Sequence, residues 1–456
     1  MSTPATTLEH ARQGVTARIA TLASGLRFED IPAPAATVAR QCLLDWFGVA
    51  LGGASDDTVR ILRDEALEQG GTAQASLVGG PGKLSVLQAA LINGTAGHAL
   101  DYDDVHYAMP GHPTAPVAPA VLALAERDGC SGRDLLTAFV AGVETECRVG
   151  RYVTQEHYER GWHATATLGH FAAAAAAARL LGLDADVTAT ALGIAGTQAA
   201  GFKSMFGTMC KPMHAGKAAA NGLHAALLAV RGFTARRDVL ECAQGFGATQ
   251  SPVCDEAALD DLDGHFFTRD VLFKFHAACY GTHSTIEAAR SLVESQQIRP
   301  EDISAVEIRI RPRYLKMCAI PRPATGLEAK FSLAMTSAMA LTGVSTAAPE
   351  RYDESLCAMP ALTRLVQRTT VTPSDEFDDA TSEIIVSTGG GVVYRMRGDV
   401  SRPAEDLVQQ GRRLREKFDA LVTPVLGATT TAELADMLER IDELADVRAL
   451  MALARS

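Results

Sequence analysis

The chain has 456 residues, of which 47% are hydrophobic and 21% are charged, values that are ordinary for a globular protein with a large core. Its formal net charge is −12 without a run of Lys or Arg, which argues against nucleic-acid binding because phosphate recognition needs a clustered basic surface. The nine cysteines are scattered without a CxxC pair, which argues against a disulfide framework or a structural zinc site.

The sequence predicts a soluble cytoplasmic protein. The N-terminus begins Met1-Ser-Thr-Pro and lacks the basic region and apolar core of a signal peptide. The most apolar run, Phe171 to Leu183, is mostly alanine, contains Arg179 and is too short to span a bilayer. We therefore expect no association with a membrane.

Residues 1–267 are predicted to form the first part of a helical domain. Ser131, with Asp134 three residues later, is typical of a capped helix start, and apolar residues follow at helical spacing. Three further stretches are rich in Ala or Gly: 87–100, 164–183 and 215–228. Small residues on every face predict helices that are buried on several sides, inside a bundle.

A different pattern begins at about residue 268. Residues 304–311 alternate between apolar and charged side chains, which predicts a half-buried strand. Residues 384–396 predict a β-hairpin around three glycines. A helix and a further strand are predicted at 328–342 and 367–372. We therefore expect an inserted α+β domain over residues 268–402.

The helical pattern returns at Glu405. Thr430 and Glu433 have the spacing of a capping box, which predicts a terminal helix that begins there. Residues 403–456 are therefore expected to complete the helical domain. The predicted fold class is mainly α, a large all-helical domain with an inserted α+β domain.

Four polar segments, each beside an apolar stretch, carry side chains that move protons near neutral pH. The first segment contains Asp101, Asp103, Asp104, His106 and His112. Taken alone, it is typical of a helix end with capping acids and solvated histidines. A metal site is the weaker alternative, because the segment has neither HExxH spacing nor the glycine of a calcium loop.

The second and third segments each precede an apolar helix. His163 follows Gly161-Trp162, and the helix dipole there would favour the neutral imidazole, which suits a base. Pro212 fits the first position of a helix, so Lys211 would lie at the N-cap, where an ammonium and free N–H groups bind a carboxylate. The structural alternatives are a core histidine and an exposed lysine.

The fourth segment lies where the two predicted domains would meet. It contains His276, Cys279, Tyr280 and His283 within residues 273–283. Domain junctions are favoured ligand sites, which predicts a binding role. The alternative is that the thiol only packs in the core.

Together, these segments resemble the MmgE/PrpD family, which includes 2-methylcitrate dehydratase, cis-aconitate decarboxylase and iminodisuccinate epimerase. The similar blocks run over most of the chain: HALDYDDVH…GHPT (98–114), GWHATATLG (161–169), FGTMCKPMHAGKAAANG (206–222), CYGTH (279–283) and EAKFS (328–332). The resemblance implies a helical domain with an α+β lid, a homodimer, and lyase chemistry on a small anionic carboxylate without a metal or an organic cofactor.

The resemblance also implies the site residues. Asp101, His112, His163 and Lys211 match catalytic positions of the family. Further substrate-binding candidates in the same segments are His106, His214, His276, Cys279 and Tyr280. Lys211 is expected to bind and polarise the substrate carboxylate, and the two catalytic histidines to act as base and acid. Asp101 is expected to orient or charge one histidine.

Three positions depart from the decarboxylase-type members. Val105 replaces a threonine, Cys279 stands where those members have a histidine, and Met335 stands where they have a tyrosine. The Cys279-Tyr280 pair and the FGTM-KPMH block resemble the epimerase-type and unassigned members more closely. Three functions therefore remain open: a lyase (dehydratase or decarboxylase), an isomerase of an amino-dicarboxylate such as iminodisuccinate, and a ligand-binding protein without catalysis.

Overall fold

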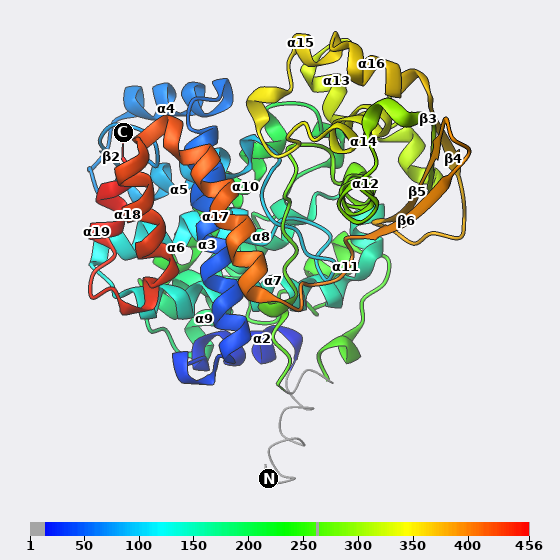
Figure 1. Cartoon of the computed structure of the whole chain (residues 1–456). Helices are drawn as coiled ribbons and strands as arrows, with labels where there is room; N and C mark the ends of the chain where they lie inside the picture. The colour runs from blue at the N-terminus through cyan, green and yellow to red at the C-terminus, as the bar shows by residue number, and fades with distance from the viewer. Residues whose placement is uncertain (1–13, 261–263, 456) are drawn as a thin grey trace. The chain divides into compact units, whose positions relative to one another are not determined.

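The computed structural model describes residues 14–260 and 264–455. The chain divides into two compact units, the first formed by Met1–Phe273 with Asp406–Ser456 and the second by Lys274–Glu405. The prediction of a mainly α fold with a small sheet region is confirmed (Figure 1). Within the described ranges, no helix combines the length and the hydrophobicity needed to cross a membrane.

The first unit is built from helices and one two-stranded antiparallel sheet. Its helices are α2 (Val15–Gly25), α3 (Ala33–Gly53), α4 (Asp57–Gln69), α5 (Val86–Ala99), α6 (Thr114–Asp128), α7 (Gly132–Glu159), α8 (Ala164–Leu180), α9 (Ala185–Gly196), α10 (Cys210–Ala229), α11 (Phe246–Gln250), α17 (Leu407–Leu426), α18 (Ala428–Glu439) and α19 (Arg448–Leu453). Its strands are β1 (Ala75–Ser76) and β2 (Lys83–Leu84).

Small residues allow α5, α8 and α10 to pack closely. A Cβ atom on Gly94 of α5 would lie 2.8 Å from the Cα of Gly216 of α10. A Cβ on Gly222 of α10 would lie 2.5 Å from the Cβ of Ala173 of α8. Close-packed interiors do not hold carbon atoms this near, so these crossings require glycine. The prediction of buried Ala-rich helices is confirmed, most clearly for α8.

Two helix starts differ from the predictions. α10 begins at Cys210 with Met209 as its N-cap, so Lys211 lies in the first turn and not at the N-cap. α18 begins directly after Gly427, whose φ of 76° ends α17, so Thr430 lies inside the first turn and caps nothing. Glycine adopts a positive φ without a steric penalty, so Gly427 sets the boundary between α17 and α18.

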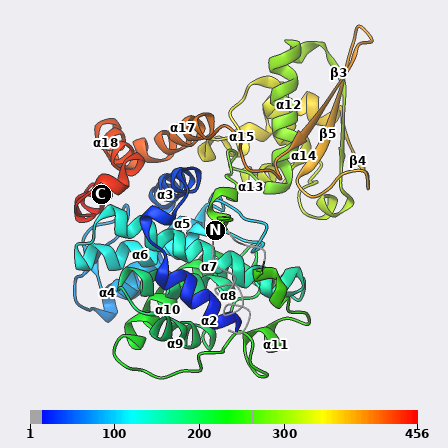
Figure 2. The same ribbon diagram turned by 90° about the horizontal axis from the view of Figure 1, so that it is seen from below.

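The second unit contains a four-stranded sheet with the order β4-β3-β5-β6. β3 is parallel to β4 and antiparallel to β5, and β5 is antiparallel to β6. Its strands are β3 (Ile303–Ile310), β4 (Thr369–Pro373), β5 (Thr381–Thr388) and β6 (Val393–Asp399). Its helices are α12 (His283–Gln296), α13 (Gly326–Lys330), α14 (Leu333–Thr342), α15 (Glu354–Cys357) and α16 (Pro360–Gln367). Figure 2 shows α12 and α14 beside the sheet.

The predicted helix over residues 328–342 is two helices. Phe331 ends α13, and the Ser332 hydroxyl accepts a hydrogen bond from the Met335 N–H as the N-cap of α14. A serine oxygen that satisfies a free helix N–H favours a new helix start, which explains the break.

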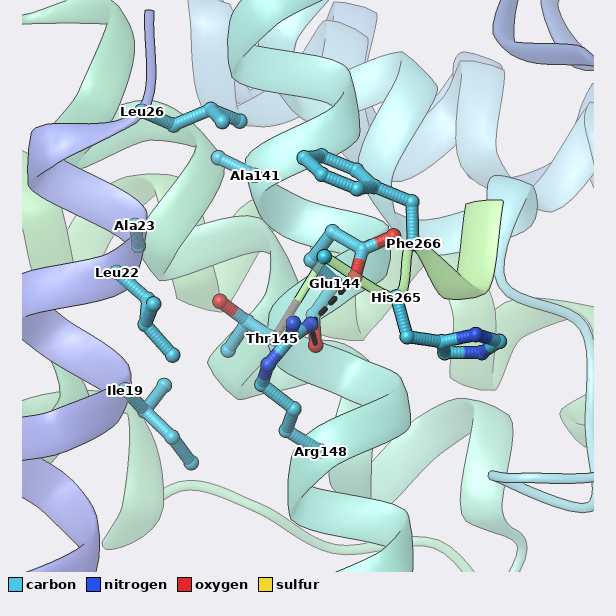
Figure 3. Close-up of a pocket in the computed structure, with 11 residues that line it drawn as sticks. Ile19, Leu22, Ala23, Leu26, Ala141, Glu144, Thr145, Arg148, His265 and Phe266 are labelled. Carbon is cyan, nitrogen blue, oxygen red and sulfur yellow. Dashed lines mark hydrogen bonds and ion pairs between the residues drawn. The ribbon is translucent and has the colours of Figure 1, made fainter. Parts of the chain in front are cut away.

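A cavity of about 160 Å³ lies beside α2 and α7 (Figure 3). Ile19 and Ala23 form part of its apolar wall, and the ion pair between Glu144 and Arg148 forms part of its polar wall. The Glu144 carboxylate also accepts hydrogen bonds of 2.8 Å from the backbone N–H and the hydroxyl of Thr268. The Glu144 carboxylate therefore anchors the segment around Thr268 to α7.

Glu146 of α7 is fully buried, and neither of its carboxylate oxygens has a hydrogen-bond partner among the described residues. Burial raises the pKa of this carboxyl well above its ordinary value. The side chain is therefore protonated in the folded protein over a pH range in which the unfolded chain is ionised.

We expect Glu146→Gln to remove a pH-dependent loss of stability. Because the pKa of Glu146 is higher in the folded state, the unfolded chain releases this proton at a lower pH than the folded protein does. The wild type therefore loses stability as pH rises above the pKa of Glu146 in the unfolded chain. As pH rises, the free energy of unfolding of the variant minus that of the wild type should increase by up to about 1.4 kcal/mol per pH unit. Urea denaturation between about pH 5 and pH 7 measures this difference.

The exposed Glu159 of the same helix provides the control. Glu159→Gln should leave the pH dependence of the wild type unchanged. Parallel stability curves for the wild type and Glu146→Gln would contradict the expectation.

Candidate active site

Four segments of the first unit bring a group of polar side chains together. His98 lies in the last turn of α5, and the loop between α5 and α6 carries Asp101, Asp103 and His112. His163 is the N-cap of α8, and α10 carries Lys211 and His214 in its first turns. The close packing of α5, α8 and α10 is what makes these helix ends converge.

An ion pair forms the exposed edge of the group. The Nζ of Lys211 lies 2.7 Å from the Oδ1 of Asp101. The Asp101 side chain is 45% exposed and that of Lys211 is 16% exposed. Asp101 has a φ of 49°, in the left-handed region that aspartate tolerates better than most residues other than glycine. The ion pair is therefore in contact with solvent.

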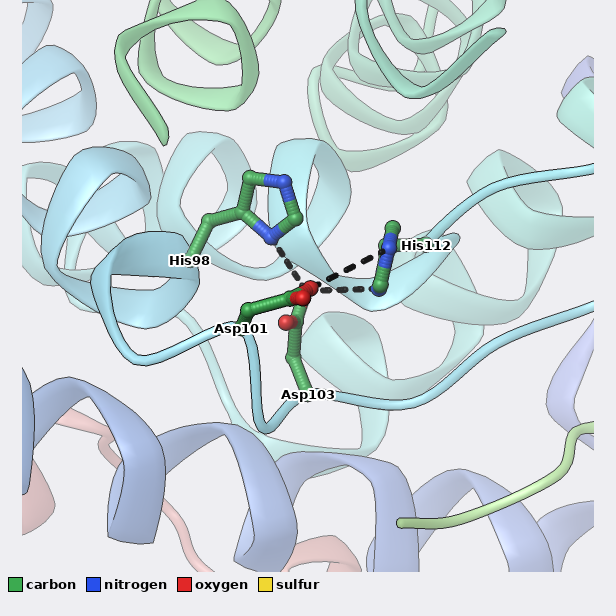
Figure 4. A group of neighbouring side chains, drawn as sticks. All are labelled: His98, Asp101, Asp103 and His112. Carbon is green, nitrogen blue, oxygen red and sulfur yellow. Dashed lines mark hydrogen bonds and ion pairs between the residues drawn. The ribbon is translucent and has the colours of Figure 1, made fainter. Parts of the chain in front are cut away.

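A buried carboxylate joins two imidazoles beneath the pair (Figure 4). The Oδ2 of Asp103 lies 2.8 Å from the Nδ1 of His98 and 3.3 Å from the Nδ1 of His112. Burial acts to raise the pKa of Asp103, but the His112 and His98 rings outweigh it and lower that pKa well below its usual range. Burial lowers the pKa of His98 to about 4. At neutral pH, Asp103 is ionised and accepts the Nδ1–H of a neutral His98.

His163 lies in a second histidine pair. Its Nδ1 is 3.0 Å from the Nδ1 of His214, and its ring stacks against that of His98 with centroids 5.9 Å apart. Burial lowers the pKa of His163 well below its usual value, and His98 and Lys211 act in the same direction. His163 is therefore neutral at neutral pH. The sequence predicted a neutral His163 from the helix dipole, but burial is the main cause.

Phe206 connects the edge and the buried part of the group. Its ring meets that of His163 edge-on with centroids 5.0 Å apart, and the Lys211 Nζ lies 5.5 Å from its centroid. An aromatic ring can contact an imidazole and an ammonium at the same time. The ammonium and the neutral imidazole therefore share one apolar wall.

The predicted candidate His106 lies apart from this group. Its Nε2 is 3.0 Å from the carbonyl of Phe267, and its Nδ1 accepts the N–H of Ala108 at 2.9 Å. The Nε2 contact thus holds the loop to the segment anchored by Glu144, and the Nδ1 contact is made within the loop itself. A role of His106 in substrate binding stays a prediction.

The remaining candidates belong to the second unit. The Nδ1 of His276 lies 2.7 Å from the Thr346 hydroxyl, and its Nε2 lies 2.9 Å from Glu287. The Tyr280 hydroxyl donates to the carbonyl of Val400 at 2.6 Å. Cys279 is partly buried, and its N–H donates to the carbonyl of Lys330. Substrate binding by these three residues also stays a prediction.

Sequence reasoning missed His98 and the inward position of Asp103. The expectation paired Asp101 with a histidine, whereas its shorter contact is with Lys211; the Nε2 of His112 is 3.8 Å away. Asp103 makes the closer contacts with imidazoles. One signal was available, because His98 lies directly before the acidic loop at the end of a helix of small residues.

The donor atoms of His98, Asp101, Asp103 and His112 all lie within 4.8 Å of one another. Two imidazoles and two carboxylates are a donor set that suits a divalent cation. The ammonium of Lys211, bound to Asp101, already supplies a positive charge at this point. A metal ion would therefore have to compete with Lys211 for that carboxylate.

Comparison with known proteins identifies two domains along the chain. The MmgE/PrpD N-terminal domain matches residues 17–253, and the MmgE/PrpD C-terminal domain matches residues 276–443. The cis-aconitate decarboxylase of Aspergillus terreus is 28% identical over 97% of this chain and 96% of its own length. The enzymes of that name from Mus musculus and Homo sapiens are each 27% identical over 97% of this chain, and over 94% and 95% of their own lengths. The chain therefore belongs to the MmgE/PrpD family of enzymes.

Proposed function

We propose that this chain is a cofactor-independent lyase that abstracts a proton next to a carboxylate of a small di- or tricarboxylate. The observation that carries the proposal is a buried, neutral His163 that shares the Phe206 wall with the Lys211–Asp101 ion pair. The relatives named cis-aconitate decarboxylase support an unsaturated tricarboxylate as the first substrate to test.

Lys211 binds the substrate carboxylate in this proposal. A proton next to a carboxylate is only weakly acidic, because its removal places enolate-like charge on a group that is already anionic. An ammonium has three N–H donors, and Asp101 uses one of them. The remaining donors hold the developing charge, and the loss of one such donor typically costs about 3 kcal/mol of barrier.

His163 takes the proton. When His163 donates its Nδ1–H to His214, its Nε2 carries the lone pair that acts as the base. Burial keeps the ring neutral, so the base is in its active form at neutral pH. His214 holds the tautomer, as a hydrogen-bond partner does for other catalytic imidazoles.

His112 acts as the acid and gives a proton to the substrate. Asp103 contacts its Nδ1, which directs its Nε2 toward Asp101 and the exposed edge. The carboxylate also stabilises the positive charge that forms on His112 when this ring carries the proton. In a dehydration, His163 takes the proton and protonation of a β-hydroxyl by His112 expels water. In a decarboxylation, the broken C–C bond leaves its electron pair on carbon as CO₂ departs, so His163 keeps no substrate proton and His112 protonates that carbon.

We expect His163→Ala and Lys211→Met each to lower kcat/KM by at least about 100-fold. Removal of the base or of the charge-holding donor typically has an effect of this size. Lys211→Met should keep the thermal transition of the wild type because Lys211 lies at the exposed edge of the group. His163→Ala removes a buried ring, so its kcat/KM is measured well below its own thermal transition. Conversion of cis-aconitate and of hydroxy-tricarboxylates, followed by NMR, measures the loss.

Matched controls exist on the same helices. His170 of α8 is also a buried histidine whose pKa burial lowers to about 4, and Lys217 is an exposed lysine of α10. His170→Gln and Lys217→Met should retain the activity of the wild type. Near-normal turnover in His163→Ala or Lys211→Met would overturn the assignment.

We expect Asp103→Asn to lower kcat by about 10²- to 10⁴-fold with little change in KM, because an amide no longer supports the charge on His112. Asp104→Asn is the matched control. Burial raises the pKa of Asp104 to about 8, so its carboxyl is largely protonated at neutral pH and resembles the amide. Equal activity of the two variants would contradict the role of Asp103.

An isomerase on the same scaffold is the second candidate. Val105, Cys279 and Met335 depart from the decarboxylase-type pattern, as the resemblance implies. If His163 and His112 act on opposite faces of one carbon, the product is the epimer. Deuterium incorporation in D₂O into an amino-dicarboxylate, without loss of water or CO₂, would favour this candidate over the lyase.

The proposal includes two further expectations from the family resemblance. Activity should survive dialysis against a chelator, and elemental analysis should find no stoichiometric metal, because Lys211 supplies the positive charge. The chain should elute as a homodimer in size-exclusion chromatography with light scattering. Loss of activity with the chelator would instead assign a metal to the His98, Asp101, Asp103 and His112 donors.

A further inference from the structure

A buried ion pair lies behind the acidic loop of the site. The Nζ of Lys417 in α17 is 2.6 Å from the Oδ1 of Asp45 in α3, and their side chains are 3% and 1% exposed. Both helices belong to the first unit and lie side by side in Figures 1 and 2. Lys417 therefore reaches α3 from the segment that follows the inserted unit.

The same ammonium holds the backbone of the loop. Lys417 donates a hydrogen bond of 2.7 Å to the carbonyl of Tyr102, and its Nζ lies 3.9 Å from the centroid of the Tyr102 ring. Tyr102 is fully buried and stands between Asp101 and Asp103 in the chain. One charged group thus contacts an α3 carboxylate, a loop carbonyl and an aromatic face.

The loop conformation needs such a contact. The φ of 49° at Asp101 is unfavourable for a residue with a Cβ and persists only where the surroundings hold it. Tyr102 is fixed on the side of Lys417, while the carboxylates of Asp101 and Asp103 converge with the histidines (Figure 4). Fixing the carbonyl of Tyr102 therefore sets the direction of both flanking carboxylates.

The burial of the pair points to this role more than to stability. Taking two charges out of water costs about as much as their attraction returns, so a buried ion pair is weak evidence for a stabilising contact. A well-packed apolar pair would fill the same space but would not bind a carbonyl oxygen. The hydrogen bond to the Tyr102 carbonyl is the contact that the charged pair provides and an apolar pair would not.

We propose that Lys417 is a positioning residue of the active site. Neutralised by Asp45, it holds the Tyr102 carbonyl, keeps Asp101 in the left-handed conformation beside Lys211, and turns Asp103 toward His98 and His112. The effect on turnover rests on the proposed function, whereas the effect on the loop does not.

The test compares two ion pairs that join α3 to the same C-terminal segment. Lys417→Met removes the positioning contact, and Asp45→Asn with Lys417→Met removes both charges, so that no unpaired charge remains buried. The control is Asp442→Asn, because Arg40 of α3 binds Asp442 through two nitrogens at 2.6 and 3.1 Å without contacting the loop. A role that only joins α3 to the C-terminal segment predicts that loop exchange also becomes faster in Asp442→Asn.

Hydrogen exchange of the loop amides, measured by mass spectrometry on the full chain, reports on the position of the loop without any substrate. Exchange over residues 100–106 should become at least about tenfold faster in Lys417→Met and in the double variant, while α5 stays protected. Asp442→Asn should exchange as the wild type does. Unchanged loop exchange in a folded double variant would overturn the proposal.

Kinetics with the converted substrate give the second readout. A displacement of about 1 Å in a catalytic group can cost about 100-fold, so kcat should fall by about 10- to 100-fold while KM stays within about twofold. Wild-type kcat in either Lys417 variant would also overturn the proposal. Faster loop exchange in a chain whose wild type converts no carboxylate would support the positioning role and reject the proposed function.

Discussion

The close approach of α5 and α10 is the constraint on which the site depends. Gly94 and Gly216 meet where a single added methyl group would separate the two backbones. His98 lies one turn after Gly94, and Lys211 lies little more than one turn before Gly216. Ion-pair and hydrogen-bond distances of about 3 Å tolerate little separation, so small residues in the core control the geometry of charged residues at the edge.

Burial divides the polar side chains into two electrostatic classes. The imidazoles of His98 and His163 are kept neutral because burial lowers their pKa values, whereas the ion pair of Lys211 and Asp101 lies nearer to solvent. A chain with a net charge of −12 repels small anions at long range, so their capture depends on a local ammonium. The partly exposed Lys211 is thus suited to anion binding, and the buried histidines are suited to proton transfer.

The sequence predicted the elements better than the geometry of the site. Helical spacing and strand alternation depend on neighbouring residues, which is why the mainly α fold and the small sheet were predictable. The direction of each aspartate between 101 and 104 was not, because it depends on a left-handed Asp101 where glycine would be the usual signal. The contact that accompanies this turn comes from Lys417, far away in the chain. No periodicity or spacing links these positions.

The division of the first unit into two chain segments affects how the protein is made. A ribosome releases α3 and the acidic loop long before α17, because all of the second unit is translated in between. During that interval, Asp45 lacks the ammonium that neutralises it, and α3 lacks the helix that covers it. Until α17 emerges, the surface of α3 that it will cover is exposed in the nascent helical unit. Chaperones or other chains would bind to that surface during this interval.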